Sequence, residues 1–415
     1  MNETSAHLWR GRTLIFVAIL LVALNLRTAV AGLSPIIPLI QADFPLDTLQ
    51  ISLLGSLAPL CFAVGALVTA PLSRRFGLER MLLAALVLMV LGHGVRTVAT
   101  GWVELAVGTL IALFGMGLGN VLMPPIVKRY FPDRLGLMTA LYLTFVAFGA
   151  LVPALIAVPV GEALTWRAAL GQWGLLALIA VVPWLMLVMR GRGAAGRPPG
   201  ADVAPDGPAN HRGAARPPIW RSPTALAITT ILAVSSVNAY AMFAWLPVIL
   251  RETAGTSPAA AGALLALFAG MGAPVALLMP LFAARMRNVS PLVHVGVALF
   301  VVGYSGLLLA PTSASALWVL MIGAGPLMFP LSFVLINLRS SSPDVSLSLS
   351  GFSQSVAYLL ALGGPPLLGV LRDGTGGWAV GLVTLAVLSV SASVAGVVIA
   401  RGHLIEDELA RHRRR

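Results

Sequence analysis

Long apolar stretches separated by short polar breaks run through almost the whole 415-residue chain. A helix that crosses a membrane needs about 20 predominantly apolar residues. None of the stretches shows the strict alternation of membrane β-strands, so the pattern predicts an all-α membrane protein with twelve transmembrane helices. The breaks place these spans at residues 13–41, 49–73, 80–98, 103–127, 135–160, 167–189, 223–249, 259–284, 290–310, 314–338, 345–370 and 378–400.

The composition excludes a soluble fold, because 58% of the residues are hydrophobic and only 10% are charged. Soluble domains average about 45–50% and 25%. The net charge of +12 does not indicate a nucleic-acid partner, since most positive residues lie in short gaps between apolar stretches, where they orient a membrane protein. The expected partners are the lipid bilayer and a small-molecule solute, with no nucleic acid, and we expect a monomer.

Motifs for covalent chemistry are missing from the sequence. The single cysteine, Cys61, allows neither an intramolecular disulfide nor a thiolate metal cluster. The six histidines lack metal-ligand spacing, and there is no phosphate-binding loop. The protein is therefore not expected to be an enzyme or to carry a cofactor or a metal.

The distribution of Lys and Arg predicts the orientation in the membrane. If the N-terminus is cytoplasmic, the inside segments hold 22 positive residues and the outside segments hold four, namely Arg96, Arg167, Arg251 and Arg372. Positive residues are enriched in cytoplasmic loops. We therefore expect a multi-pass protein of the inner (plasma) membrane with both termini in the cytoplasm.

One interruption is much longer than the others and divides the chain into two sets of six spans. Residues 190–222 are rich in Pro, Gly and Arg and have no apolar periodicity, which is typical of a flexible cytoplasmic linker. The predicted organisation is an N-terminal six-helix bundle (1–189), this linker, a C-terminal six-helix bundle (223–400) and a basic cytoplasmic tail (401–415).

The two sets of spans repeat several features at corresponding places, which indicates two pseudo-symmetric bundles. Transporters built from duplicated halves bind their solute between the halves, near the middle of the membrane. The repeated features are a proline at the end of the second and eighth spans (Pro71, Pro280), a Gly-x-Gly step before a proline in the fourth and tenth (Gly115 with Pro124, Gly323 with Pro330), and an acid near a tryptophan after the fifth and eleventh (Glu162 with Trp166, Asp373 with Trp378).

Four spans carry distinctive strings. These are ALNLR from Ala23 to Arg27, GNVLMPPIVKRYFP from Gly119 to Pro132, RSP at Arg221 with AWLP from Ala244, and LSGFSQSVAYLL from Leu349 to Leu360. Together they resemble the branch of the major facilitator superfamily that includes cyanate permease and the 2-nitroimidazole transporter. The resemblance covers nearly the whole chain, and it implies a major facilitator fold that transports a small polar solute.

The sequence departs from that resemblance in two places. The superfamily's loop after the second helix reads GxLaDRxG, whereas this chain has APLSRRFG from Ala70, with Arg74 at the position of the acid. Related sequences carry Gln-Ser in the seventh helix and a Gln in the tenth, where this chain has Ser235-Ser236 and Gly325. Loss of two amides implies a different or less polar ligand.

Arg27 is the strongest candidate for solute binding, because it lies at the midpoint of the first span. A mid-membrane Arg costs at least ~2.5 kcal/mol and must face a partner or a wet cavity. All fifteen Asp and Glu residues fall at span ends, in loops or in tails, so none is available as a partner within a span. The guanidinium fork suits a carboxylate or similar anion. The alternative is that Arg27 bonds helix carbonyls and only pins the first helix.

Two asparagines of the first half are further candidates. Asn25 precedes Arg27 by two residues, about 200° around a regular helix, so it is not expected to share a face with Arg27. Asn120 follows the run Gly115-Met116-Gly117, which allows close approach to another helix. For both asparagines the alternative is a hydrogen bond between helices. His93 and Arg96, near the outer end of the third span, are interpreted as structural.

The second half supplies Asn238, Tyr240, Gln354 and Tyr358, all near mid-depth of the seventh and eleventh spans. Gln354 and Tyr358 are four residues apart and share a helix face. An amide and a phenol together can hold a small polar ligand, with the ring as an apolar wall. Again the alternative is a bond between helices.

These residues predict a secondary transporter for a small polar or anionic solute (a cyanate-like anion, a small carboxylate or a nitroimidazole-like heterocycle) that works by alternating access. The absence of a carboxylate from the spans argues against proton symport through a titrating acid, whereas facilitated movement and co-transport of a proton with an anion both stay open. The alternatives are a multidrug efflux transporter of the same fold, or a sensor or intramembrane enzyme, which would need a signalling domain or a catalytic cluster.

Overall fold

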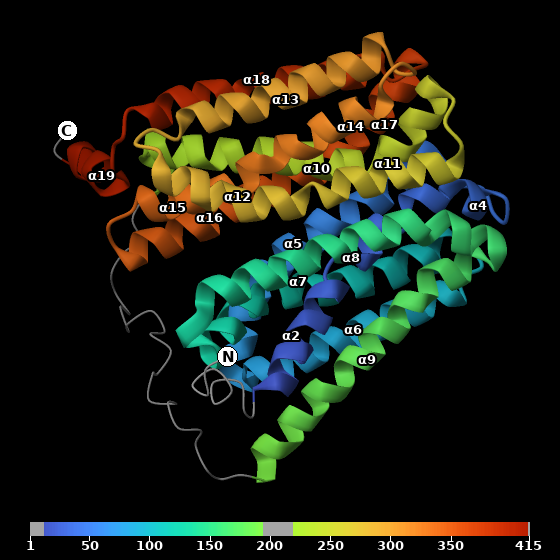
Figure 1. Ribbon diagram of the computed structural model, residues 1–415, viewed down its shortest axis with the longest axis horizontal. Helices are drawn as coiled ribbons and strands as arrows, with labels where there is room; N and C mark the ends of the chain where they lie inside the picture. The colour runs from blue at the N-terminus through green and yellow to red at the C-terminus, as the bar shows by residue number, and fades with distance from the viewer. Residues whose placement is uncertain (1–11, 194–218, 414–415) are drawn as a thin grey trace, which may run out of the picture.

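The computed structural model describes residues 12–193 and 219–413, and within these ranges all the regular secondary structure is helical. Twelve helical segments are long and apolar enough to cross a membrane, which confirms the predicted number. They form two bundles of six spans (Figure 1). The part of the predicted linker between 194 and 218 lies outside the described residues.

The N-terminal half contains the first six spans. Its elements are α2 (Thr13–Asn25), α3 (Thr28–Ala31), η1 (Ser34–Ile36), α4 (Ile37–Gln41), α5 (Thr48–Phe76), α6 (Leu78–Thr97), α7 (Trp102–Tyr130), η2 (Pro132–Arg134), α8 (Leu135–Ala163) and α9 (Trp166–Gly193).

The C-terminal half contains the last six spans and a short terminal helix. Its elements are η3 (Ile219–Arg221), α10 (Pro223–Ala254), α11 (Pro258–Gly270), α12 (Gly272–Arg285), α13 (Ser290–Leu309), α14 (Ser315–Ala324), η4 (Gly325–Leu327), α15 (Met328–Leu338), α16 (Pro343–Leu362), α17 (Gly364–Thr375), α18 (Ala379–Ala400) and α19 (Ile405–Arg413).

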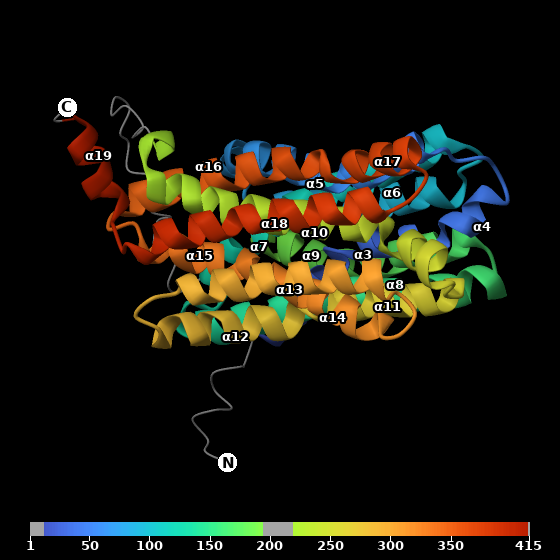
Figure 2. The same ribbon diagram turned by 90° about the horizontal axis from the view of Figure 1, so that it is seen from above.

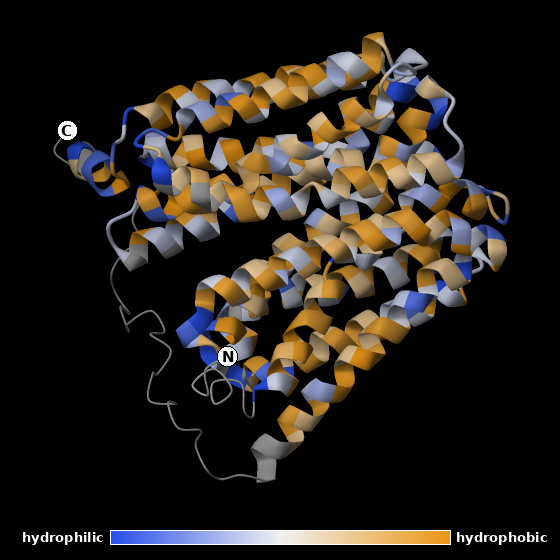
Figure 3. Ribbon diagram, viewed as in Figure 1, coloured by the Kyte–Doolittle hydropathy of each residue, from blue (hydrophilic) through white to orange (hydrophobic). Residues whose placement is uncertain are grey.

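The spans extend lengthwise between the same two ends of the molecule (Figure 2). We call the end where α9 stops and η3 begins the linker end, and the opposite end, next to α4, the distal end. In Figure 1 the two bundles lie together at the distal end and diverge toward the linker end. Hydrophilic residues gather at both ends and apolar residues cover the length between them (Figure 3). Large apolar side chains such as Leu67, Leu309 and Val394 are exposed, as expected for a protein whose surface lies largely in lipid.

Several spans that the sequence presents as single apolar stretches are broken helices. The first is interrupted between α2 and α3 at Leu26 and Arg27, the tenth by the 3-10 turn η4 and the eleventh at Gly363. Backbone irregularity at membrane depth is tolerated where it is buried in protein or lines a cavity. By contrast, α10 at the start of the second half is continuous.

Close helix packing in the N-terminal half depends on small residues, as the glycine run in the fourth span suggested. A Cβ atom on Gly117 of α7 would lie 2.7 Å from the carbonyl oxygen of Cys61 on α5. A Cβ on Gly115 would lie 2.5 Å from the carbonyl oxygen of Ala85 on α6. Glycine therefore lets α7 touch two neighbouring backbones at once.

At the distal end of the N-terminal half, one carboxylate accepts hydrogen bonds from two side chains. Asp43 accepts hydrogen bonds from Trp166 Nε1 (2.8 Å) and Arg167 Nη1 (2.6 Å). These bonds keep the pKa of Asp43 below its usual range. The acid in contact with the Trp-Arg pair is thus Asp43, from the loop after the first span, and not Glu162.

The C-terminal half repeats this triad. Glu252 accepts hydrogen bonds from Trp378 Nε1 (2.8 Å) and Arg372 Nη2 (2.7 Å). Arg372 also reaches Asp373, which in turn accepts a hydrogen bond from Thr48 Oγ1 of the N-terminal half (3.0 Å). The N-terminal triad lies within one half, whereas the C-terminal triad is connected to a hydrogen bond between the halves.

The basic tail contains a helix, α19, that packs against the C-terminal half through Ile405 and Leu409. Glu406 accepts hydrogen bonds from the backbone N–H groups of Ser341 and Ser342, at the start of α16. Although burial alone would raise the pKa of Glu406, these bonds and its own N–H hold the pKa below its usual range. The α19 helix therefore joins α16 through a charged acceptor.

We expect this contact to stabilise the protein only while Glu406 is ionised. Because the pKa is lower in the folded state, the contribution is present above the unfolded pKa and is lost as the pH falls through the folded pKa. Glu406→Gln should therefore lower stability at neutral pH by about 1 kcal/mol or less, and this difference should shrink below about pH 4.5. Thermal melts of both proteins across pH test this, with the exposed neighbour Asp407→Asn as the control. A constant difference at all pH values would contradict it.

Candidate functional site

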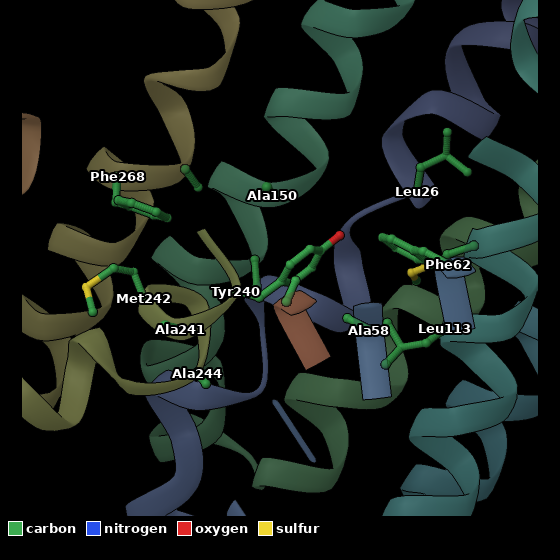
Figure 4. Packing of buried hydrophobic residues seen from close by; sticks show 14 of the residues in the cluster. Leu26, Ala58, Phe62, Leu113, Ala150, Tyr240, Ala241, Met242, Ala244 and Phe268 are labelled. Atoms are coloured by element: carbon green, nitrogen blue, oxygen red, sulfur yellow. The ribbon is translucent and has the colours of Figure 1, made fainter. Parts of the chain in front are cut away.

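Four side chains meet at mid-depth between the two halves, and we call them the central cluster: Arg27, Phe62, Tyr240 and Tyr358. The rings of Phe62, Tyr240 and Tyr358 are mutually edge-on, with centroids 6.3, 6.3 and 6.4 Å apart. The Arg27 guanidinium carbon lies 4.9 Å from the centre of the Phe62 ring, in cation–π geometry. Figure 4 shows the Tyr240 ring projecting from the C-terminal half with its hydroxyl toward Phe62 and Leu26.

Arg27 reaches the cluster because the first span is broken at this residue. Asn25 ends α2 and Thr28 begins α3, and the backbone of Arg27 has φ −133° and ψ −2°, outside the helical region. The angular offset expected between Asn25 and Arg27 on a regular helix therefore does not apply. Discontinuous helices are a recurrent way for transporters to present ligand-binding groups at mid-membrane.

The guanidinium of Arg27 is only partly used by the protein. It lies within hydrogen-bonding reach of the Tyr240 hydroxyl and its charge also acts on Tyr358, while its Nη1 atom is buried without a hydrogen-bond partner among the described residues. No salt bridge joins Arg27 to an acid in the described part of the chain. The cluster thus carries a positive charge with at least one donor atom, Nη1, that the described residues leave unused.

Phe62 is the cluster residue that sequence reasoning missed. It lies on α5 and is 3% exposed, among many other apolar residues of a membrane span. Nothing in the apolar pattern distinguishes it from a lipid-facing or core position. Its contact with an intramembrane Arg is visible only in three dimensions.

The two predicted asparagines of the N-terminal half do not join the cluster. Asn25 is fully buried and its Nδ2 donates to the carbonyl of Leu21, while its Oδ1 has no partner among the described residues. Asn120 is partly buried and donates to the carbonyl of Met116. Both amides thus use one of their two N–H donors on the preceding turn of their own helix.

In the C-terminal half, Asn238 forms a buried network that favours the structural alternative. Its Nδ2 donates to the Val234 carbonyl and to Ser389 Oγ, and its Oδ1 accepts from Tyr304 at 2.6 Å. This network joins α10, α13 and α18. Gln354 is on the same helix as Tyr358, and its amide donates to Ser350 Oγ at 2.8 Å.

Two cavities lie between the cluster and the distal end. A vestibule of about 760 Å³ is lined by residues that include Arg251, Glu252 and Asp373. A second cavity of about 30 Å³ reaches Tyr240, and both cavities are lined by Ile37 and Ile51. A void of about 30 Å³ holds one or two waters and no solute. This second cavity, the one that reaches Tyr240, is therefore too small to hold a solute.

The groups in the cluster can recognise a small ligand through charge, hydrogen bonds and ring contacts. It contains one permanent cation, two phenolic hydroxyls and three aromatic rings, contributed by both halves. No group of three His, Cys, Asp or Glu residues in the described ranges could hold a metal ion.

Comparison with known proteins agrees with this architecture. Residues 15–342 match the Major Facilitator Superfamily. The chain is 34% identical over 399 residues to the 2-nitroimidazole transporter of Escherichia coli (94% of this chain, 96% of the relative), and 26% identical over 367 residues to the cyanate transport protein CynX of Escherichia coli (88% and 91%). A solved bacterial homologue of the lysosomal transporter Spinster, in an inward-facing and unoccupied conformation, superposes with a TM-score of 0.71 at 14% identity (94% and 97%).

The family match and the similarity to known transporters show a membrane transporter and not an enzyme. The chain belongs to the Major Facilitator Superfamily, which confirms the fold and the family that the sequence motifs indicated.

Proposed function

We propose that the protein is a secondary transporter that binds a small, planar anion or a small polar heterocycle at the central cluster. The observation that carries this proposal is Arg27, whose guanidinium lies between the two halves over an aromatic ring with no described carboxylate as its partner. A guanidinium fork binds two oxygens of a carboxylate or nitro group, and aromatic edges and faces enclose a flat ligand. The names of the relatives, a nitroimidazole transporter and a cyanate transport protein, are compatible with such ligands.

We also propose that transport proceeds by alternating access, with the linker end facing the cytoplasm and the protein in the inner membrane. The narrow distal cavity and the hydrogen bonds Thr48 to Asp373 and Ser56 to the Leu362 carbonyl support a distally closed state. The excess of Lys and Arg toward the linker end supports a cytoplasmic position for that end. No carboxylate lies in the central cluster, so coupling through a titrating acid there is not part of the proposal.

A binding screen on the purified protein tests the ligand class. The panel contains cyanate, benzoate, 2-nitroimidazole and the neutral benzamide, measured by thermal shift and then by calorimetry. We expect at least one planar anion or nitro compound to bind and benzamide to bind much more weakly. Binding of many unrelated apolar compounds instead would favour the multidrug exporter.

Tyr358→Phe should weaken the affinity for the ligand found by the screen by about 1–2 kcal/mol, or roughly five- to thirtyfold, because a polar contact is lost in a partly dry site. The matched control is Tyr304→Phe, another buried tyrosine, which should lower the melting temperature because it leaves Asn238 Oδ1 with a weaker partner. Equal loss of affinity in both variants, or loss only in Tyr304→Phe, would place the ligand away from the central cluster.

A further inference from the structure

A second arginine, Arg96, is buried completely inside the N-terminal half. It lies in the last turn of α6, is 0% exposed, and its Nε, Nη1 and Nη2 atoms all lack hydrogen-bond partners among the described residues. By sequence, Arg96 counts among the four positive residues of the outside segments. In the structure Arg96 lies within the helix bundle. None of the salt bridges between described residues includes it, so its charge is not neutralised locally.

The packing around Arg96 explains why its side chain turns inward. A Cβ atom on Gly108 of α7 would lie 2.9 Å from Arg96 Cγ and 2.9 Å from the carbonyl oxygen of Gly92. The missing side chain at Gly108 therefore makes room for the Arg96 stem between α6 and α7. A smaller hydrophobic residue at position 96 would occupy this space with a lower free-energy cost of burial, because a buried unpaired charge is strongly unfavourable.

A short chain of contacts connects Arg96 with the central cluster. His93, one turn earlier on α6, lies 3.5 Å from Thr28 Oγ1 and 3.0 Å from the Leu170 carbonyl. Thr28 is the neighbour of Arg27. Arg27 is thus the sequence neighbour of one partner in this contact, and Arg96 lies about one helical turn from the other, both inside the N-terminal half.

From this placement we infer that Arg96 is a specificity-determining residue for anions: a fixed buried charge whose field, together with that of Arg27, makes the central cluster selectively attractive to negative solutes. Arginine stays protonated in proteins. At an effective dielectric constant of about 20, a unit charge roughly 12 Å away changes the local concentration of a monovalent ion about tenfold, and salt screens a buried charge poorly. The inference rests on the proposed anion binding at the cluster, and Arg96 touches no solute itself.

The field can be measured without knowing the solute. In a Cys61→Ala background, Tyr358→Cys or Gln354→Cys reports the potential at or beside the cluster through its reaction rates with negatively charged MTSES, positively charged MTSET and neutral MMTS. With Arg96 present we expect MTSES to be favoured over MTSET. Arg96→Met or Arg96→Gln should lower the MTSES/MTSET rate ratio at least about tenfold and leave the MMTS rate unchanged, because the two charged reagents respond in opposite directions.

Two controls separate the field from a packing effect. Arg96→Lys keeps the charge and should keep the rate ratio, whereas Arg129→Met, which removes a surface cation paired with Glu79 in the same half, should change it little. An unchanged MTSES/MTSET ratio in Arg96→Met and Arg96→Gln would overturn the inference. So would an equally large change in the MMTS rate. The inference would also be overturned if Arg96→Lys folded and neither uncharged variant did. If the ratio falls as expected but no anion binds in the ligand screen, the field is present and the proposed solute class is wrong.

Discussion

Arg27→Ala is expected to lower the affinity for an anionic solute at least about a hundredfold while the protein remains folded. Hydrogen bonds to a charged partner contribute about 1.5–3 kcal/mol each, and the fork can make two of them. The empty protein should melt at the same or a higher temperature, because removal of a mid-membrane charge relieves its burial cost. For a neutral nitro or carbonyl ligand the same change should weaken binding less, since only uncharged hydrogen bonds are lost.

Arg27→Lys distinguishes the charge from the fork. Lysine keeps the cation but presents no planar pair of donors, so affinity should fall to an intermediate value. Calorimetry and thermal melts of both variants make the comparison, with Arg129→Ala as the surface control. If Arg27→Ala melts much lower and still binds normally, Arg27 is a structural pin and the proposed site is wrong.

Loss of the distal hydrogen bonds between the halves should open the distal route. Thr48→Val removes the bond to Asp373, and Ser56→Ala removes the bond to the Leu362 carbonyl. One hydrogen bond to a carboxylate and one uncharged hydrogen bond contribute about 2–4.5 kcal/mol together, so the population of a distally open state should rise at least about tenfold in the double variant. A cysteine at Ala58, which lines the narrow cavity on α5, reports that state.

The measurement is the rate at which a membrane-impermeant thiol reagent labels Ala58→Cys from outside intact cells, in a Cys61→Ala background. Asp43→Asn is the matched control, because it weakens the chemically similar triad that stays within one half. It should lower stability without faster labelling. Equal acceleration in both variants would show general loosening, and absence of outside labelling at the exposed Asp47→Cys would contradict the proposed orientation.

The hydrophobic pattern alone was sufficient for the number of spans and their division into two halves. Lipid imposes this outcome, since each membrane helix must satisfy its own backbone and present apolar side chains over about 20 residues. The cost of burying a charge in lipid also made Arg27 recognisable as a candidate binding residue, because a charge in the middle of an apolar stretch is unfavourable wherever the helix packs. Tyr240 and Tyr358 were recognisable as candidate binding residues for a related reason, since a polar group in the middle of the membrane needs a hydrogen-bond partner.

The tertiary structure decided which of these residues meet, and it added others. No glycine or proline marks Leu26 or Arg27, so the break that turns Arg27 toward Phe62 follows from packing against the rest of the bundle. The contact of Phe62 with Arg27, and the complete burial of Arg96, a residue interpreted as structural from its position, could not be predicted from the sequence. Phe62 is one apolar residue among many. Arg96 is a charged residue near the end of a span, where the sequence does not distinguish a loop from a buried helical turn.

Asn238 shows the same limit from the other side. Its position at mid-depth suggested a ligand contact, but Tyr304 and Ser389 from two other helices occupy its amide. Burial cost depends on a residue's own position along the membrane normal, and the sequence determines that quantity. Whether a buried polar group bonds a neighbour or is free for a solute depends on the rotation and spacing of several helices, which only the folded protein determines.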